Sequence, residues 1–337
     1  MEYRPLGRSG LKVSVLCLGT MTIGGRTDEK TAARMFASLR ESGVNFVDTA
    51  DGYMDGRSEE IIGRLTRRDR DRWVIATKVG YTRDPAPRTG PLSRKWMMRS
   101  IDGSLTRLGT DHVDIWYLHK HDPNTPLAES VATVGDAIVQ GKVRYWGFSN
   151  YRGWQIGELI RLGDSLGLPR PVVSQPYYNA MNRMPETDYL PACGYYGVSA
   201  VPYSPLARGV LTGKYRPGTK PPPDSRAVTG YDPRMIETEY RDESLALVQG
   251  IKDHAEARGM TAGQFALLWV LNSSNVASVV AGPRTPAQWR SYLGALDHRF
   301  TAADEALIDA MVPAGHPSTP GYTDPLYPVA GRAPRIA

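Results

Sequence analysis

Four side chains capable of proton transfer follow strand-like runs in this sequence. Asp48 and Tyr53 come just after the run 45–47, and Lys78 and His119 lie near the ends of two later runs. A phenol has a pKa of about 10, and an adjacent ammonium favours its ionised form. At about 4 Å and an effective dielectric near 20, this attraction reaches about 4 kcal/mol, at most roughly three pK units. We therefore expect Lys78 to bring the pKa of Tyr53 towards neutrality, with Asp48 holding Lys78 charged and in position.

Each of these residues also has an ordinary structural explanation. An Asp at a strand end often caps a helix, a Tyr is often part of the core, and a Lys is usually solvated. His119 and His121 have strand spacing and could face one metal ion together. The remaining histidines follow no comparable strand, so no metal site is predicted.

Strand-like and amphipathic segments alternate along the chain, which indicates an α/β protein. Eight strands, each followed by a helix, are typical of a closed (β/α)8 barrel of the TIM type. The carboxyl ends of such strands share one mouth, where these barrels place their chemistry. The strands are expected at 13–20, 45–50, 73–79, 112–119, 143–150, 171–178, 199–204 and 277–282.

The segments between the strands have the features of helix starts and ends. Asp28 and Ser93 are plausible N-caps, and glycines stand where helices should end. These glycines are Gly43, Gly109, Gly141, Gly167, Gly197 and Gly259. The helices are expected at 28–42, 58–66, 93–108, 127–140, 154–166, 186–196, 243–258, 261–271 and 286–296.

Three further segments complete a single predicted domain over 1–337. A β-hairpin is expected at 2–12. Residues 207–241 are rich in Pro and Gly and are expected to form a long loop after the seventh strand that clasps a ligand. Residues 312–337 are expected to form an extended C-terminal tail over the barrel mouth. Long loops in compact domains are usually functional or disordered.

The composition of the chain restricts the classes of partner and the location that we expect for the protein. With 41% hydrophobic and 23% charged residues, and no apolar run of membrane-spanning length, we expect a soluble protein without a membrane partner. The net charge of +6 comes with scattered arginines and no nucleic-acid motif, so no nucleic-acid partner is expected. The two cysteines, Cys17 and Cys193, fit no disulfide or zinc pattern. Without an export signal, the expected location is the cytoplasm.

Two nucleotide-binding motifs fail on inspection. The run from Gly209 to Lys214 resembles a phosphate loop, but it is one residue short and has Tyr215 where Ser or Thr should bind magnesium. No GxGxxG motif follows a strand, so a Rossmann site is not supported.

Taken in order, seven motifs resemble those of the aldo-keto reductase superfamily. They are DTADGYMDGRSEEIIG, ATKVG, VDIWYLHKHDP, GKVRYWGFSNY, SQPYYN, VPYSPLARGVLTGKY and AGPRTPAQW, and the resemblance spans residues 3–311. It is strongest to bacterial reductases related to potassium-channel beta subunits. The resemblance implies a (β/α)8 barrel that binds NADPH across its mouth and reduces aldehydes or ketones.

The resemblance also implies roles for the four residues. Tyr53 matches the general acid that protonates the carbonyl oxygen, and His119 matches the group that orients this oxygen. Lys78 would tune the tyrosine and Asp48 would anchor the lysine. His119 is chosen over His121 because it lies five residues after Asp114, as in the family pattern.

Cofactor contacts follow from the same resemblance. The nicotinamide end would be bound by Ser149, Asn150 and Gln175, with Tyr203 stacked on the ring and Thr20 and Met21 beside the ribose. The pyrophosphate clasp would comprise Ser204, Leu206, Arg208, Gly209, Lys214 and Arg226. The adenosine end would be bound by Gly282, Arg284, Gln288 and Tyr292.

At the adenosine end the sequence departs from the usual pattern. Ser291-Tyr292 replaces the Glu-Asn pair of many relatives, so Tyr292 could stack on the adenine instead. Arg284 favours NADPH over NADH because a guanidinium can pair with the 2′-phosphate through two hydrogen bonds.

Two other functions remain open. A cofactor-sensing regulatory protein with slow carbonyl reduction would use the same site. A barrel glycosidase needs two carboxylates beside the sugar and ranks last, because Asp48 is committed to Lys78. A small carbonyl compound is the expected partner, and a homo-oligomer is possible. The substrate would meet a largely aromatic wall comprising Met21, Tyr81, Trp116, His121 and Tyr322.

Overall fold

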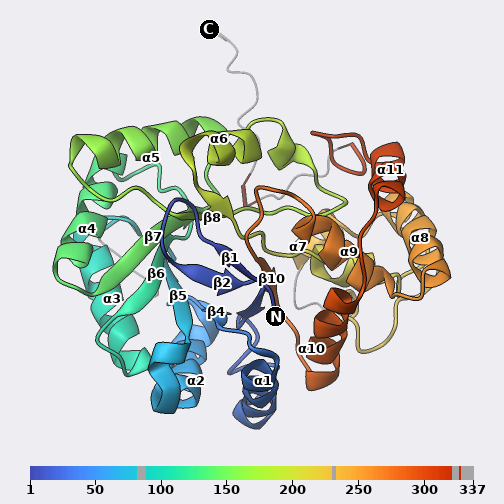
Figure 1. Cartoon of the computed structure of the whole chain (residues 1–337), viewed down its shortest axis with the longest axis horizontal. Coiled ribbons are helices and arrows are strands. Elements are labelled where there is room, and N and C mark those ends of the chain that lie inside the picture. Colours follow the sequence, from blue (N-terminus) through green and yellow to red (C-terminus); the bar gives the residue numbers. More distant parts are fainter. Residues whose placement is uncertain (82–88, 230–232, 321–325, 328–337) are drawn as a thin grey trace, which may run out of the picture.

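A computed structural model describes residues 1–81, 89–229, 233–320 and 326–327. Its main sheet has eight parallel strands in the order β10-β3-β4-β5-β6-β7-β8-β9. Hydrogen bonds from Ala277 N to Ala200 O (2.9 Å) and from Val280 N to Pro202 O (2.9 Å) join the two ends. The closed (β/α)8 barrel is thereby confirmed (Figure 1). The strands are β3 Leu16–Gly19, β4 Phe46–Asp48, β5 Val74–Val79, β6 Val113–Leu118, β7 Val143–Ser149, β8 Val173–Gln175, β9 Ser199–Ala200 and β10 Val279–Ala281.

The predicted N-terminal hairpin is present and lies across one end of the barrel. Strands β1 (Tyr3–Pro5) and β2 (Lys12–Ser14) pair in antiparallel fashion and cross the middle of the ring in Figure 1. Gly7 N donates to Ser199 Oγ (2.8 Å), at the start of β9. The hairpin therefore closes the N-terminal end of the barrel and leaves the opposite end for the site.

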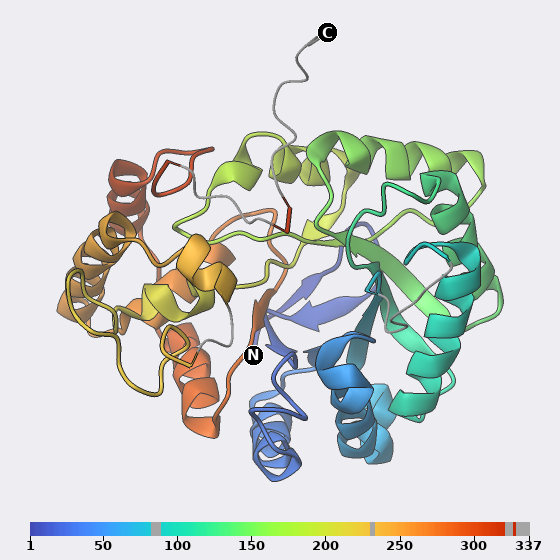
Figure 2. The same cartoon turned by 180° about the vertical axis from the view of Figure 1, so that it is seen from behind.

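Helices form an outer layer around the sheet, as Figures 1 and 2 show. Asp28 accepts a hydrogen bond from Thr31 N and Ser93 accepts one from Trp96 N, so both expected N-caps are confirmed. All six glycines expected at helix ends have a left-handed φ, a conformation that glycine adopts without steric cost. The expected helices are observed as α1 Glu29–Ser42, α2 Arg57–Thr66, α3 Arg94–Leu108, α4 Leu127–Val139, α5 Gly153–Ser165, α6 Tyr189–Tyr196, α8 Asp242–Ala257, α9 Ala262–Leu271 and α10 Pro286–Leu293.

Two regions differ from the sequence expectations. The segment 207–241, expected as a loop, contains a 3-10 helix (Ala207–Thr212) and the short helix α7 (Pro233–Glu237). Helix α11 (Ala302–Met311) was not predicted, although its start is marked by a capping box between Thr301 and Asp304. Short 3-10 segments also occur at Tyr53–Gly56, Arg67–Arg72, Met184–Glu186 and Gly294–Asp297.

The barrel strands are buried on both faces, as parallel barrels require. On β6, Ile115 and Tyr117 pack inside the barrel, whereas Trp116 and Leu118 pack in the layer between strands and helices. The expectation that Trp116 lines a substrate pocket was therefore wrong. Alternation along the strand turns its ring outward, away from the mouth.

Close packing of α2 against the end of α3 generates a stability prediction. A Cβ added at Gly63 would lie 2.3 Å from Leu108 O, whereas one added at Gly163 would meet no atom within 4 Å. We expect Gly63→Ala to lower the free energy of unfolding by about 1–3 kcal/mol, because the backbone must shift. The matched control Gly163→Ala should be neutral or stabilising by up to about 1 kcal/mol. Urea denaturation of both variants tests this; equal effects would contradict it.

Candidate active site

A cavity of about 660 Å³ lies at the carboxyl ends of the strands. Asp48, Ser149 and Gln175 line it at the ends of β4, β7 and β8, and His119 lines it directly after β6. Every residue that the sequence assigned to the cofactor also lines it: Thr20, Met21, Ser149, Asn150, Gln175, Tyr203, Ser204, Leu206, Arg208, Gly209, Lys214, Arg226, Gly282, Arg284, Gln288 and Tyr292. The fold thus brings residues from the whole length of the chain to one cavity.

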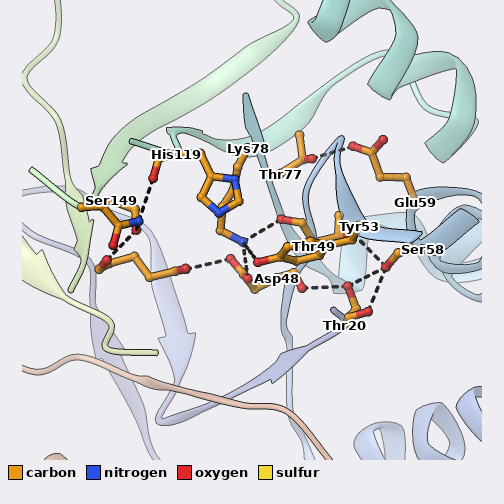
Figure 3. A network of polar contacts seen from close by, with 12 residues as sticks. Thr20, Asp48, Thr49, Tyr53, Ser58, Glu59, Thr77, Lys78, His119 and Ser149 are labelled. Carbon is orange, nitrogen blue, oxygen red and sulfur yellow. Dashed lines mark hydrogen bonds and ion pairs between the residues drawn. The ribbon is translucent and has the colours of Figure 1, made fainter. Parts of the chain in front are cut away.

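Lys78 is at the centre of the contacts that join Asp48, Thr49 and Tyr53 (Figure 3). Its Nζ donates to Asp48 Oδ1 (2.5 Å), Thr49 O (2.8 Å) and Tyr53 OH (3.1 Å). An ammonium has three donors, so all of them are used here. The Lys78 side chain is 0% exposed and that of Asp48 is 2% exposed. Lys78 is therefore fixed beneath the cavity, and Tyr53 presents its hydroxyl at the cavity wall.

The surroundings of Lys78 favour its charged form, as expected, whereas the pKa of Tyr53 shifts in the direction opposite to the expected one. Burial disfavours the Lys78 ammonium, but Asp48 and Tyr53 outweigh it and raise the pKa of Lys78 to about 12. Burial raises the pKa of Tyr53, and the opposing effect of Lys78 is smaller. The expected shift towards neutrality was wrong because the sequence argument omitted desolvation of the phenol. Tyr53 accordingly keeps its proton, and its hydroxyl, which accepts from Lys78 Nζ, can donate that proton to a further acceptor.

His119 completes the group as a neutral imidazole. Burial lowers the pKa of His119 well below its usual value, and the positive charges of Lys78 and Lys120 lower it further. Its ring lies 6.0 Å from the Tyr53 ring and 4.6 Å from the Tyr81 ring, edge-on to both. A carbonyl oxygen in this cavity could therefore meet a phenol and an imidazole together.

The residues expected at the nicotinamide end form one hydrogen-bonded chain. Ser149 Oγ donates to Gln175 O (2.7 Å), and Asn150 Nδ2 donates to Ser149 Oγ (2.9 Å) and His119 O (2.8 Å). Tyr203 OH donates to Asn150 Oδ1 (2.9 Å). Gln175 Nε2 donates to Asp48 Oδ2 (2.8 Å), which joins this chain to the Lys78 contacts. The two groups of residues therefore form one connected hydrogen-bond network.

Backbone strain is concentrated at the same mouth. Among the described residues, the non-glycine residues with positive φ follow β4, β7 and β9: Met54, Asp55, Asn150, Ser204, Ala207 and Arg208. Such conformations persist only where surrounding contacts enforce them, and they are frequent at functional sites.

The far end of the cavity is basic. Burial raises the pKa of Tyr292 to about 12, and the positive charges of Arg226 and Arg284 oppose this rise. The backbone N of Arg284 donates to Gln288 Oε1 (2.7 Å). Arg284 and Tyr292, which were assigned to the adenosine end, thus share this part of the cavity with Arg226, which was assigned to the pyrophosphate clasp.

Glu239 is a residue that sequence reasoning missed. It is fully buried and pairs with Arg208, which also donates to Thr238 Oγ1 (3.0 Å). Tyr177 OH also donates to Glu239, and the Tyr177 ring stacks on that of Tyr203 at 5.5 Å. The Arg208 side chain, expected at a pyrophosphate, therefore also joins two parts of the segment after β9 to each other. No periodic pattern marks Glu239 in the sequence.

The expected substrate wall is only partly observed. Met21 and Tyr81 line the cavity, and Leu326 and Tyr327 from the C-terminal tail line it as well. The ring of His121 packs edge-on against Tyr151 at 5.7 Å. Tyr322, like most of the tail beyond residue 320, lies outside the described residues.

A parallel barrel with a buried Lys-Asp pair, a phenol and a neutral imidazole at its mouth defines a barrel oxidoreductase. The chain belongs to the aldo/keto reductase family, which it matches over residues 15–313. Aldo/keto reductases are oxidoreductases that generally use NAD(P)H.

Proteins of two descriptions are among its relatives. A probable voltage-gated potassium channel subunit beta of Arabidopsis thaliana is 38% identical over 302 residues, covering 88% of this chain and 92% of the relative. The L-glyceraldehyde 3-phosphate reductase of Escherichia coli K12 is 35% identical over 332 residues, covering 94% and 93%. Across the described residues, no helix combines the length and apolar character needed to cross a bilayer.

The neutral state of His119 generates a prediction of pH dependence. Because the folded pKa lies below the unfolded one, the unfolded chain binds the proton first as pH falls. Folding stability should therefore decline below about pH 6.5, and His119→Gln should make this decline shallower. NMR of ¹³C-labelled histidine should show neutral His119 at pH 6, assigned by its loss in His119→Gln. A charged His119 at pH 6 would contradict the prediction.

Proposed function

We propose that this protein is an NADPH-dependent reductase of aldehydes or ketones with Tyr53 as the general acid. The observation that supports this best is the contact of Lys78 Nζ with both Asp48 and the Tyr53 hydroxyl. An acid that lines a cavity and is held beside a buried, fixed cation is arranged for proton transfer to a bound molecule.

The cavity fits a dinucleotide. Its volume of about 660 Å³ is within the range of cofactor sites, roughly 300–1,000 Å³. One end has the amides and hydroxyl of Ser149, Asn150 and Gln175, and the other has Arg226 and Arg284. A Cβ at Gly282 would meet only Gly19 O, at 3.9 Å, so the backbone there is open to a close approach. These residues would hold NADPH, with Lys214 and Arg208 near the pyrophosphate.

In this mechanism the bound NADPH supplies the hydride. Tyr53 donates its proton to the carbonyl oxygen, and neutral His119 donates a hydrogen bond that orients the same oxygen. The Lys78 ammonium stabilises the phenolate left on Tyr53, because a positive charge favours the ionised phenol. Asp48 and Thr49 O keep Lys78 charged and directed at the hydroxyl.

For the substrate, we propose several candidate classes of carbonyl compound rather than one molecule. The Escherichia coli relative is named for L-glyceraldehyde 3-phosphate, so short phosphorylated aldehydes are one candidate class. Sugars, aromatic aldehydes, quinones and diketones are others. We place the reaction in the cytoplasm, with a homo-oligomer as a possible assembly.

A second candidate function is cofactor sensing for a partner protein. Its support is the 38% identity to a probable voltage-gated potassium channel subunit beta. A stoichiometric partner whose binding differs between NADPH and NADP⁺ would favour this function. NADPH binding without reduction of any carbonyl would also favour it.

Tyr53→Phe tests the acid. The variant should lose at least about 10²-fold in kcat, because the proton donor is removed. Its Kd for NADPH, followed by fluorescence titration, should change little. NADPH oxidation should be measured against a panel of aldehydes, ketones and quinones with the wild-type protein beside it. Joint loss of turnover and NADPH binding would count against the assigned role.

Arg284→Ala tests the choice of cofactor. It should weaken NADPH binding about 10- to 100-fold, the effect of losing a charged hydrogen-bond pair, and hardly affect NADH. Fluorescence titration with each cofactor measures both constants. Equal losses for NADPH and NADH would remove Arg284 from the 2′-phosphate.

A further inference from the structure

An aromatic ring inside the barrel lies next to the Lys78 ammonium. Tyr117 on β6 is the direct register partner of Lys78 on β5. Side chains that stand opposite each other on neighbouring strands point to the same face of a sheet. Lys78 Nζ lies over the Tyr117 ring, 5.9 Å from its centroid. This distance is within the range of about 6 Å at which the face of an aromatic ring attracts a cation.

The fold makes room for this ring. Tyr117 is 0% exposed and belongs to the apolar cluster inside the barrel. Its register partner on β7 is Gly147, where a Cβ would lie 2.2 Å from Val173 O and 3.1 Å from Tyr117 Cε1. Within the described part of the chain, the buried Tyr117 hydroxyl has no hydrogen-bond partner. Tyr117 therefore meets the site through its ring and not through its hydroxyl.

The titratable groups around Lys78 leave one negative charge beside it. Among the described residues these groups are, besides this ring, Asp48 on β4, Tyr53 after β4, His119 after β6 and Cys17 on β3. Burial keeps the phenol and the imidazole neutral, and it raises the pKa of the Cys17 thiol well above its usual value. Asp48 therefore balances the ammonium alone, and a ring can add attraction without adding a second charge.

We propose that Tyr117 is a positioning residue for carbonyl reduction that acts through Lys78. Its ring holds the ammonium at the Tyr53 hydroxyl and favours the charged form of the lysine. This inference rests on the proposed reduction, in which that charge stabilises the phenolate. A ring attracts a desolvated cation more strongly than an exposed one, and the Lys78 side chain is 0% exposed.

Two substitutions separate the ring from the hydroxyl. Tyr117→Phe keeps the ring and removes an unpaired buried hydroxyl, so kcat should stay within about twofold and the urea midpoint should not fall. Tyr117→Leu removes the ring and should lower kcat about 5- to 30-fold. The Kd for NADPH should stay within about twofold in both variants, because the described lining of the cavity does not include Tyr117.

Phe46→Leu is the matched control for lost packing. Phe46 is also 0% exposed and belongs to the same cluster inside the barrel, on β4. This substitution removes a ring from the same core, so the urea midpoint should fall by an amount similar to that in Tyr117→Leu. Its kcat should stay within about twofold, because the lost ring does not hold the ammonium.

NMR of ¹³C-labelled lysine tests the contact without cofactor or turnover. The comparison is made with Tyr53→Phe also present, because the phenol and the ammonium otherwise titrate as a pair. Loss of one signal in Lys78→Met assigns that signal. As pH rises, Lys78 should begin to lose its proton about 0.5–1 pH unit earlier in Tyr117→Leu than in Tyr117→Phe.

Three results would overturn the inference. An equal loss of kcat in Tyr117→Phe and Tyr117→Leu would assign the effect to the hydroxyl. An equal loss in Phe46→Leu would reduce it to packing. The same onset of Lys78 titration with and without the ring would remove the ring from the ammonium. If the wild-type protein binds NADPH but reduces no carbonyl of the panel, the proposed reduction fails instead, and the NMR comparison still shows whether the ring supports the charge.

Discussion

The arrangement of the rest of the site depends on one buried ion pair, between Lys78 and Asp48. Lys78 and Asp48 lose almost all contact with water, and such a pair is tolerated only with good geometry and satisfied hydrogen bonds. The ammonium therefore needs Thr49 O and Tyr53 OH as its remaining acceptors, and the second Asp48 oxygen needs Gln175. Since Gln175 lies on β8, the pair links opposite parts of the barrel. The ion pair with its hydrogen bonds can therefore form only when β4, β5 and β8 are assembled in the barrel. The same assembly positions the Tyr53 hydroxyl beside Lys78.

A second layer of polar contacts supports this arrangement (Figure 3). Ser58 Oγ donates to Thr20 Oγ1 (2.8 Å) and lies 3.1 Å from Thr49 Oγ1, which holds the loop after β4 against β3. On the outer side of β5, Thr77 Oγ1 donates to the buried Glu59 (2.5 Å), which also pairs with Arg107. Contacts of this kind can hold the residues at the mouth in their left-handed backbone conformations. Such strained conformations persist only where the surrounding structure enforces them.

Cations and a neutral imidazole lie at different places around the cavity. Arg226 and Arg284 act on Tyr292 at the adenosine end, and Arg208 forms a buried ion pair with Glu239. A polyanionic cofactor would meet the two arginines there, and the neutral His119 would remain available to a carbonyl oxygen. Either proposed function, carbonyl reduction or cofactor sensing, would use this same geometry, since the two differ in rates and partners rather than in the residues present.

The sequence alone determined the barrel, its helix caps and the order of the four reactive residues. Those features depend on local periodicity, on capping chemistry and on the ends of strands, all of which neighbouring residues encode. Tertiary structure decided what depends on burial and distant contact. Desolvation raised the pKa of Tyr53, contrary to the expectation, and strand alternation turned the Trp116 ring away from the barrel interior. Glu239 forms an ion pair with Arg208, from which it is separated by an irregular segment. Tyr327 likewise reached Tyr81 from the end of the chain. No local pattern specifies such contacts, because their energies arise only when the folded chain excludes water from both partners.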